Sequence, residues 1–193
     1  MKNAILLFLL GLATSTCFSQ QQYEQKTVQI LPESVLNISG DTNISAFHCE
    51  FDTSLLKGKH EFQYSEETGS IYFKNAVLNL ENKGFDCGNR AINKDFNALM
   101  QTEKYPGIKL ELKKVSFDQE DNAMARVNII MAGIEKNYII PVTIINCPTP
   151  NYKGSLHLNI KDFGLEPPRK FFGLIVIKDD IEINFNLVVK PQK

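Results

Sequence analysis

The acidic side chains offer the first test for catalysis, because general acid–base chemistry needs carboxyl groups that converge on one substrate. Two acidic pairs stand out, Asp179-Asp180 and Glu66-Glu67. Each pair joins neighbours in the chain, which is typical of a solvated rim and does not by itself bring carboxylates together. The sequence also has no GxSxG elbow, no Gly-rich phosphate loop and no HExxH motif. We therefore expect a protein that is not an enzyme.

Cysteine and histidine side chains are the candidates for a metal site or a disulfide. Three cysteines follow the first twenty residues: Cys49, Cys87 and Cys147. They form no CxxC pair and the three histidines are scattered, so the spacing argues against a closed zinc site. In an oxidising compartment three cysteines allow one bridge and leave one thiol.

The N-terminal residues 1–19 have the pattern of a secretory signal peptide. Lys2 gives a positive start, an apolar run follows over residues 4–13, and small and polar residues lead to Ser19. The run is too short for a transmembrane helix, which needs about 20 apolar residues. We expect residues 1–19 to be removed and residues 20–193 to form one exported domain, periplasmic or secreted, with no integral membrane segment.

Apolar and polar residues alternate along most of the remaining chain. The longest such run has Ile181, Ile183, Phe185, Leu187 and Val189 on one face. Similar runs cover residues 108–112, 127–131, 138–144 and 156–160, and residues 44–51 and 71–77 also look like strands. Period-two alternation is typical of antiparallel strands with one dry face. Eight or more strands predict a barrel or a sandwich, with a hairpin connection at residues 133–136.

One segment, residues 89–103, has helical spacing instead. Its apolar positions are Ile92, Phe96, Leu99 and Met100. These fall on one face of a helix, which the Tyr105-Pro106-Gly107 sequence should end. A barrel with a single helix across one side or end is the simplest architecture.

Composition excludes several classes of protein. The 193 residues are 43% hydrophobic and 22% charged, with a net charge of −1. A disordered chain would be less hydrophobic and more highly charged. A nucleic-acid-binding protein would carry a basic surplus, so we expect no nucleic-acid partner.

Several blocks, in order along the chain, resemble the YceI-like (polyisoprenoid-binding) family. They are GDTNISAF at residues 40–47, FDCGN at 85–89, NKDF at 93–96, KYPGI at 104–108, AGI at 132–134, IPV at 140–142 and DFGLEPP at 162–168. The resemblance implies a lipocalin-like antiparallel β-barrel of about eight strands. It also implies an exported protein that holds a long-chain isoprenoid, or a quinone-like molecule, in its bore, with no other cofactor.

Two other functions stay open from the sequence. One is a structural or protein-interaction module whose barrel is filled by its own side chains. The other is an enzyme acting on a lipid or quinone, which no motif in the sequence supports. A homodimer is also compatible with the sequence.

The alternation assigns an inward face and hence candidate ligand contacts. We predict that the bore is lined by Ile108, Leu110, Leu112, Val127, Ile129 and Met131, joined by Phe163, Phe171 and Phe172. The segment at residues 162–173 should cover one barrel end, with Arg169 and Lys170 facing a phosphate or another polar head group. The alternative is a plug that only seals the core.

For the disulfide, Cys49 and Cys87 are the preferred pair, with Cys147 left free. Cys49 lies in a strand-like segment and Cys87 at the start of the helical segment, and both belong to blocks that resemble the family. Cys147 instead precedes Pro148 in a turn-like stretch.

Overall fold

The computed structural model describes residues 22–119, 121–146, 148–167 and 176–192. Four of the predicted ligand-binding residues lie outside the described residues: Arg169, Lys170, Phe171 and Phe172. The predicted signal peptide, residues 1–19, and the predicted free thiol of Cys147 also lie outside them.

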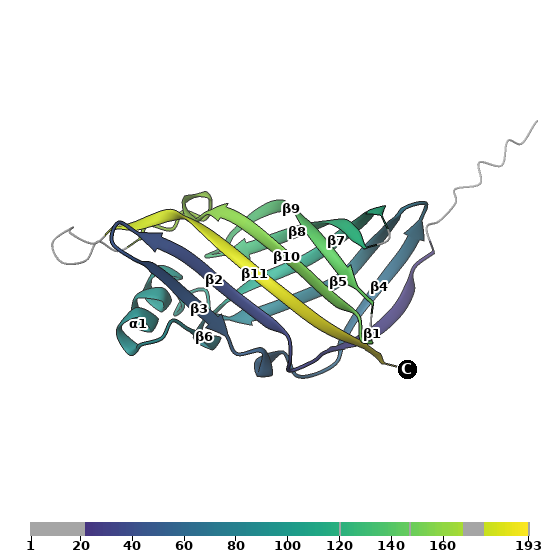
Figure 1. Ribbon diagram of the computed structural model, residues 1–193, viewed down its shortest axis with the longest axis horizontal. Helices are drawn as coiled ribbons and strands as arrows, with labels where there is room; N and C mark the ends of the chain where they lie inside the picture. The colour runs from purple at the N-terminus through teal and green to yellow at the C-terminus, as the bar shows by residue number, and fades with distance from the viewer. Residues whose placement is uncertain (1–21, 120, 147, 168–175, 193) are drawn as a thin grey trace, which may run out of the picture.

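Eight antiparallel strands form a closed ring (Figure 1). In ring order they are β1 (Glu24–Ile30), β4 (His60–Glu67), β5 (Ser70–Glu81), β7 (Gly107–Gln119), β8 (Asn122–Met131), β9 (Ile134–Ile145), β10 (Asn151–Asn159) and β11 (Ile177–Gln192). The ring closes where β1 pairs with the end of β11, from Thr27 opposite Gln192 to Ile30 opposite Val189. The predicted eight-stranded antiparallel barrel is confirmed.

Three further strands extend the sheet beyond the ring. They are β2 (Val35–Thr42), β3 (Ala46–Phe51) and β6 (Phe85–Asp86), which follow β11 in the order β11-β2-β3-β6. The long strand β11 pairs with β2 near its start and with β1 near its end. Three short 3₁₀ segments connect the strands: η1 (Thr53–Leu56), η2 (Asn82–Gly84) and η3 (Ile160–Phe163).

The predicted helix is present but shorter than expected. α1 covers Arg90–Leu99, and the Asn89 side chain caps it by accepting hydrogen bonds from the backbone N–H groups of Ala91 and Ile92. The helix ends early because Gln101 adopts a φ of 51°, which cannot continue a right-handed helix. The expected apolar face is also narrower, because Ile92 is 37% exposed. None of the described helices is long and apolar enough to cross a membrane.

The predicted hairpin connects β8 to β9, with its turn one residue earlier than expected. Ala132 and Gly133 have φ values of 48° and 80°, as a type I′ turn requires. A Cβ atom on Gly133 would lie 2.7 Å from the ring of Tyr105, so this position has both conformational and steric reasons for glycine. Residues 134–136, placed in the connection by the sequence analysis, already belong to β9.

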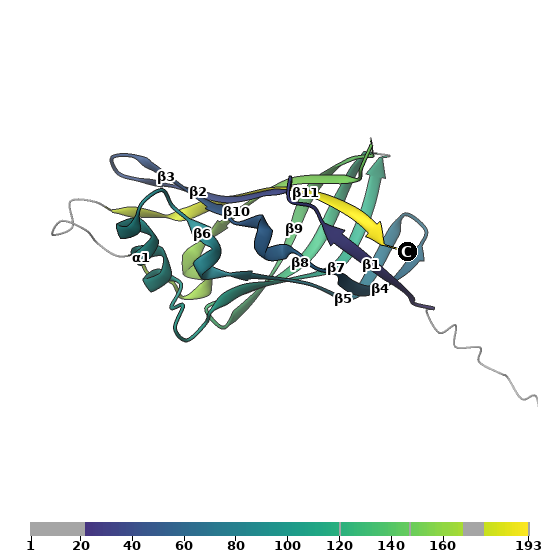
Figure 2. The same cartoon turned by 90° about the horizontal axis from the view of Figure 1, so that it is seen from below.

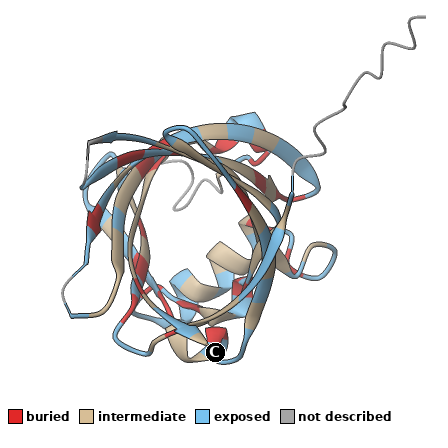
Figure 3. Ribbon diagram, turned by 90° about the vertical axis from the view of Figure 1, so that its right-hand side faces the viewer, coloured by how far each residue is buried: buried red, intermediate tan, exposed pale blue. Residues whose placement is uncertain are grey.

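The two ends of the barrel differ. At one, the helix end, α1, η3 and the β3–β6 corner lie together (Figures 1 and 2). At the other, the mouth end, lie the start of β1 and the β4–β5 hairpin, and the ring is seen from this side in Figure 3. The largest completely buried side chains are Phe163, Ile129, Met131, Leu165, Asn82 and Cys49.

Candidate ligand-binding bore

The strand registers determine which side chains face the interior of the ring. Leu112 lies opposite Val127 on β8, and Val127 lies opposite Tyr138 on β9. Directly paired residues share a face of a sheet, and alternate residues along a strand return to that face. All the residues on β7 and β8 that the sequence analysis predicts to line the bore therefore lie on the inner face.

These inward residues divide into two groups by exposure. Ile108, Ile129 and Met131 are buried, with Ile129 only 1% exposed, and they belong to the hydrophobic core. Leu110 and Leu112 on β7 are only half-buried. An inward side chain of a closed ring can be exposed only to space inside that ring. The interior is therefore not filled by the barrel's own side chains around these residues.

Val127, the remaining predicted residue of these two strands, is half-buried as well. The same state is found in inward residues that the sequence analysis did not assign to the site: Leu78, Val142, Ile183, Phe185 and Leu187. Their alternation was visible in the sequence, and it would have found them if every strand had been treated as a wall of the bore. The lining is predominantly aliphatic and aromatic, which suits a hydrocarbon ligand.

Phe163 closes the helix end of the bore. It is 1% exposed and stacks on Tyr138, with ring centroids 6.2 Å apart and an interplanar angle of 24°. Leu165, two residues further on, is equally buried. In the described part of the predicted loop, Phe163 and Leu165 thus pack into the core, whereas Asp162, Gly164 and Glu166 are exposed.

Two tyrosines add polar groups to this largely apolar interior. The Tyr138 hydroxyl is buried and has no hydrogen-bond partner among the described residues. Burial raises the pKa of Tyr138, and the negative charge of Asp162 raises it further. Burial also raises the pKa of Tyr152, which lies opposite Leu187 on the inner face of β10. Both hydroxyls therefore stay protonated near neutral pH.

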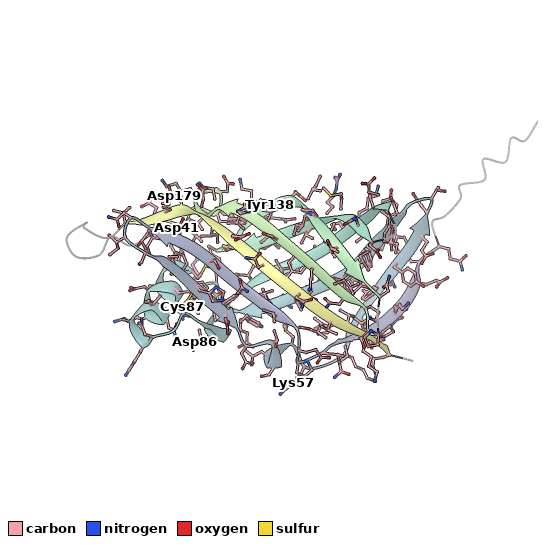
Figure 4. All side chains as sticks on the ribbon, viewed as in Figure 1. Asp41, Lys57, Asp86, Cys87, Tyr138 and Asp179 are labelled. Atoms are coloured by element: carbon pink, nitrogen blue, oxygen red, sulfur yellow. A yellow bond between two sulfur atoms is a disulfide. The ribbon has the colours of Figure 1, made fainter. Side chains whose placement is uncertain are left out.

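A disulfide joins Cys49 to Cys87 at the helix end (Figure 4). Phe51 lies opposite Phe85 in the β3–β6 pairing, which places Cys49 opposite Cys87 one step beyond the end of β6. The Cα atoms of the bridged residues are 3.9 Å apart. This is the pair that the sequence analysis preferred, and it holds the start of α1 against the sheet.

The acidic pairs do not build a catalytic centre with each other. Asp179 forms an ion pair with Lys161, while Asp180 accepts a hydrogen bond from the Asn159 side-chain amide at 2.8 Å. Glu66 is exposed and lies next to the last residue of β4. Among the described residues, no group of three or more His, Cys, Asp and Glu side chains could hold a metal ion.

A groove of about 800 Å³ involves β2, β11, β10, β9, β8 and β7, and its lining combines outward-facing residues with the inward Val142 and Phe185. Its outward-facing lining consists mainly of amide and hydroxyl side chains with a few apolar ones, among them Asn37, Asn184, Asn186, Ser155, Val35 and Met124. The outward-facing side chains of this groove are thus mainly polar, whereas the inward residues of the barrel are mainly apolar.

Comparison with known proteins supports the same architecture. Residues 27–189 match the model of the YceI-like domain. A polyisoprenoid-binding domain from Saccharophagus degradans, implicated in plant cell wall breakdown, superposes with a TM-score of 0.63 at 13% identity, covering 88% of this chain and 100% of that one. BcnA of Burkholderia cenocepacia gives a TM-score of 0.61 at 16% identity, covering 81% and 96%.

A mutant of the YceI protein of Campylobacter jejuni also superposes, with a TM-score of 0.52 at 14% identity and coverage of 100% and 99%. A search of curated proteins finds no match. The structural likenesses show a shared lipocalin-like fold, and the family match extends over nearly all of the described barrel. The chain belongs to the YceI-like domain family.

Proposed function

We propose that this protein is an exported lipid-binding protein that holds a long-chain isoprenoid, or a similar amphiphile such as a quinone, inside its barrel. The observation that carries the proposal is the half-buried state of inward apolar side chains in a closed ring, Leu110 and Leu112 among them. An eight-stranded barrel is wide enough either to be filled by its own side chains or to hold one small ligand. Because inward apolar side chains remain partly exposed to the interior, the second alternative, a bound ligand, is favoured.

The energetics point the same way. Apolar surface left in contact with water costs about 25 cal/mol per Å² relative to burial. A flexible hydrocarbon chain threaded along the bore would cover that surface without needing hydrogen-bond partners. Leu112, Val127 and Leu187 present branched aliphatic groups to the interior, which is the lining that such a chain requires.

Two further observations support the biological setting. One structural relative is described as a polyisoprenoid-binding domain, which makes an isoprenoid the leading ligand class for this chain as well. The signal-peptide pattern of residues 1–19 and the Cys49–Cys87 disulfide both suit an oxidising compartment such as the periplasm. A role in binding, without a catalytic step, is consistent with a lining of mostly apolar groups.

Native mass spectrometry of the protein purified without detergent tests the proposal. We expect a bound species of one lipid mass per chain, released under denaturing conditions and absent or strongly reduced in the Leu112→Asp variant. A wild-type protein that carries no adduct and takes up none from mixed isoprenoid alcohols and quinones would overturn the proposal. That result would favour a structural or interaction module.

A further inference from the structure

A small polar cavity lies on the inner face of the barrel at the mouth end. It measures about 330 Å³ and is lined by Gln22, Glu24, Tyr64, Ser65 and Glu66. Its place on the inner face follows from the registers: Glu66 lies opposite Ile71, which lies opposite Val115, which in turn lies opposite the inward Ala125. The cavity therefore adjoins the apolar bore.

The carboxylates of Glu24 and Glu66 supply this cavity with hydrogen-bond acceptors. The Tyr64 hydroxyl donates to Glu24 Oε2 at 2.7 Å, so its proton is already used. The hydrogen bond to Glu24, burial and the charges of Glu24 and Glu66 together raise the pKa of Tyr64. Two carboxylates line the cavity and no cationic side chain does. Lys26 lies on the same inner face, opposite Phe62, with its Nζ 5.5 Å from the centre of the Tyr64 ring, so two carboxylates face one ammonium group here.

The character of the wall changes sharply one step further into the barrel. Phe62 follows Tyr64 on the inner face of β4 and packs against Phe73, with ring centroids 5.6 Å apart. Beyond these rings the inward residues of β5 and β7 are aliphatic, as at Leu78 and Leu112. Acceptor groups at the mouth and an apolar interior match the two ends of an amphiphile.

We propose that the Glu24–Tyr64–Glu66 cavity holds the polar end of the bound amphiphile and selects an uncharged hydrogen-bond donor, such as an alcohol, over an anionic head group. The inference rests on the proposed function, because it takes the bore as the site of the hydrocarbon chain. Glu24 and Glu66 are both exposed at the mouth, and their negative charges repel a carboxylate or phosphate. The same oxygens accept a hydrogen bond from a hydroxyl.

Two matched fluorescent probes test this selectivity: 12-(1-pyrenyl)dodecanol and 12-(1-pyrenyl)dodecanoate, titrated into the full chain at pH 8 and low ionic strength. We expect the wild-type protein to bind the alcohol about fivefold more tightly than the carboxylate. The reason is that the solvated carboxylates of Glu24 and Glu66 repel the carboxylate of the probe. The Glu24→Gln/Glu66→Gln double variant should bring this ratio close to one. Added salt should also reduce the ratio in the wild type.

Glu61→Gln is the matched control. Glu61 lies on the same strand as Tyr64 but on the outer face, opposite Thr27, and its loss removes one carboxylate without altering the cavity. The ratio should stay at its wild-type value in this variant. Equal affinities in the wild type, a ratio that survives the double variant, or a ratio that Glu61→Gln changes equally would overturn the head-group assignment and leave lipid binding intact. Failure of both probes to bind the wild type would instead overturn the proposed function.

Discussion

The helix end and the mouth end of this barrel use the same alternating strands for different purposes. At the helix end, inward residues such as Ile129 and Phe163 are almost completely buried, and the disulfide and α1 cover the strands. Further along the same strands, inward residues such as Leu112 and Leu187 stay half-buried. At the mouth, the inner face carries the charged Glu24 and Glu66.

The contrast between completely buried and half-buried inward residues separates stability from binding. Buried volume at the helix end supplies the packing that stabilises the fold, because close-packed side chains gain both hydrophobic and dispersion energy. The half-buried segment gives up part of that gain and leaves space for a ligand. A substitution at the helix end should therefore change mainly the free energy of unfolding, and one in the open segment mainly ligand affinity.

The disulfide should give the largest effect on stability. It closes a separation of 38 residues, and the chain-entropy relation assigns about 4 kcal/mol to a loop of that size. We expect the Cys49→Ser/Cys87→Ser variant to lose about that much unfolding free energy in urea titrations. An unchanged urea midpoint would show that the bridge does not hold the helix end together.

Packing at Ile129 should come next. Ile129→Ala removes three methyl or methylene carbons from a site with 1% exposure, and such changes cost about 2–5 kcal/mol. Leu112→Ala, on the half-buried part of the wall, should cost about 1 kcal/mol, because the lost groups already contact interior space. Chemical denaturation of both variants without ligand gives the comparison. Equal losses would contradict the difference between the two segments.

A charge placed in the open segment should affect binding more than folding. Leu112→Asp puts a carboxylate where the hydrocarbon chain should lie, and we expect pyrenyl-dodecanol to bind about tenfold more weakly. Asn79→Asp is the control, because exposed Asn79 lies on the outer face of β5 opposite Lys109. Similar affinities for the two variants would place the ligand outside the bore.

The smallest effect concerns acid stability at the disulfide corner. Hydrogen bonds from the Asn93 side chain and from the Gly88 backbone N–H lower the pKa of Asp86, which is labelled in Figure 4. A carboxyl with a lowered folded-state pKa stabilises the fold above its unfolded pKa, near 3.8, and loses that contribution as the pH falls through the folded value. Urea midpoints between pH 6 and pH 2.5 should therefore fall less steeply for Asp86→Asn than for the wild type. Parallel profiles would count against this role.

Much of the barrel could be predicted from period-two alternation, because a strand with one dry face has few other ways to fold. The irregular backbone positions that interrupt the strands and the helix could not be predicted in this way. Asn75 adopts a φ of 60° where the β5–β7 register shifts, and although asparagine tolerates this conformation, one asparagine in a strand-like run does not by itself predict a bulge. The early end of α1 at Gln101 likewise depends on local backbone geometry that helical spacing does not report.

The candidate site shows the same division. Alternation correctly indicates that Leu112 and Ile129 share the inner face, but their different burial depends on what α1, η3 and Phe163 cover in three dimensions. The acceptor cavity brings Glu24 and Tyr64 together across 40 residues of sequence. Each looks like an ordinary solvated residue in the sequence, and only the β1–β4 register makes them neighbours.

Methyl NMR with a spin-labelled lipid tests the central claim most directly. A long-chain alcohol with a nitroxide near mid-chain should broaden the methyl signals of inward Leu110, Leu112 and Val127. Signals of Val35 and Met124, on the outer groove, should keep their intensity. Broadening at the outer groove with sharp signals from the inward residues would contradict a ligand held inside the barrel.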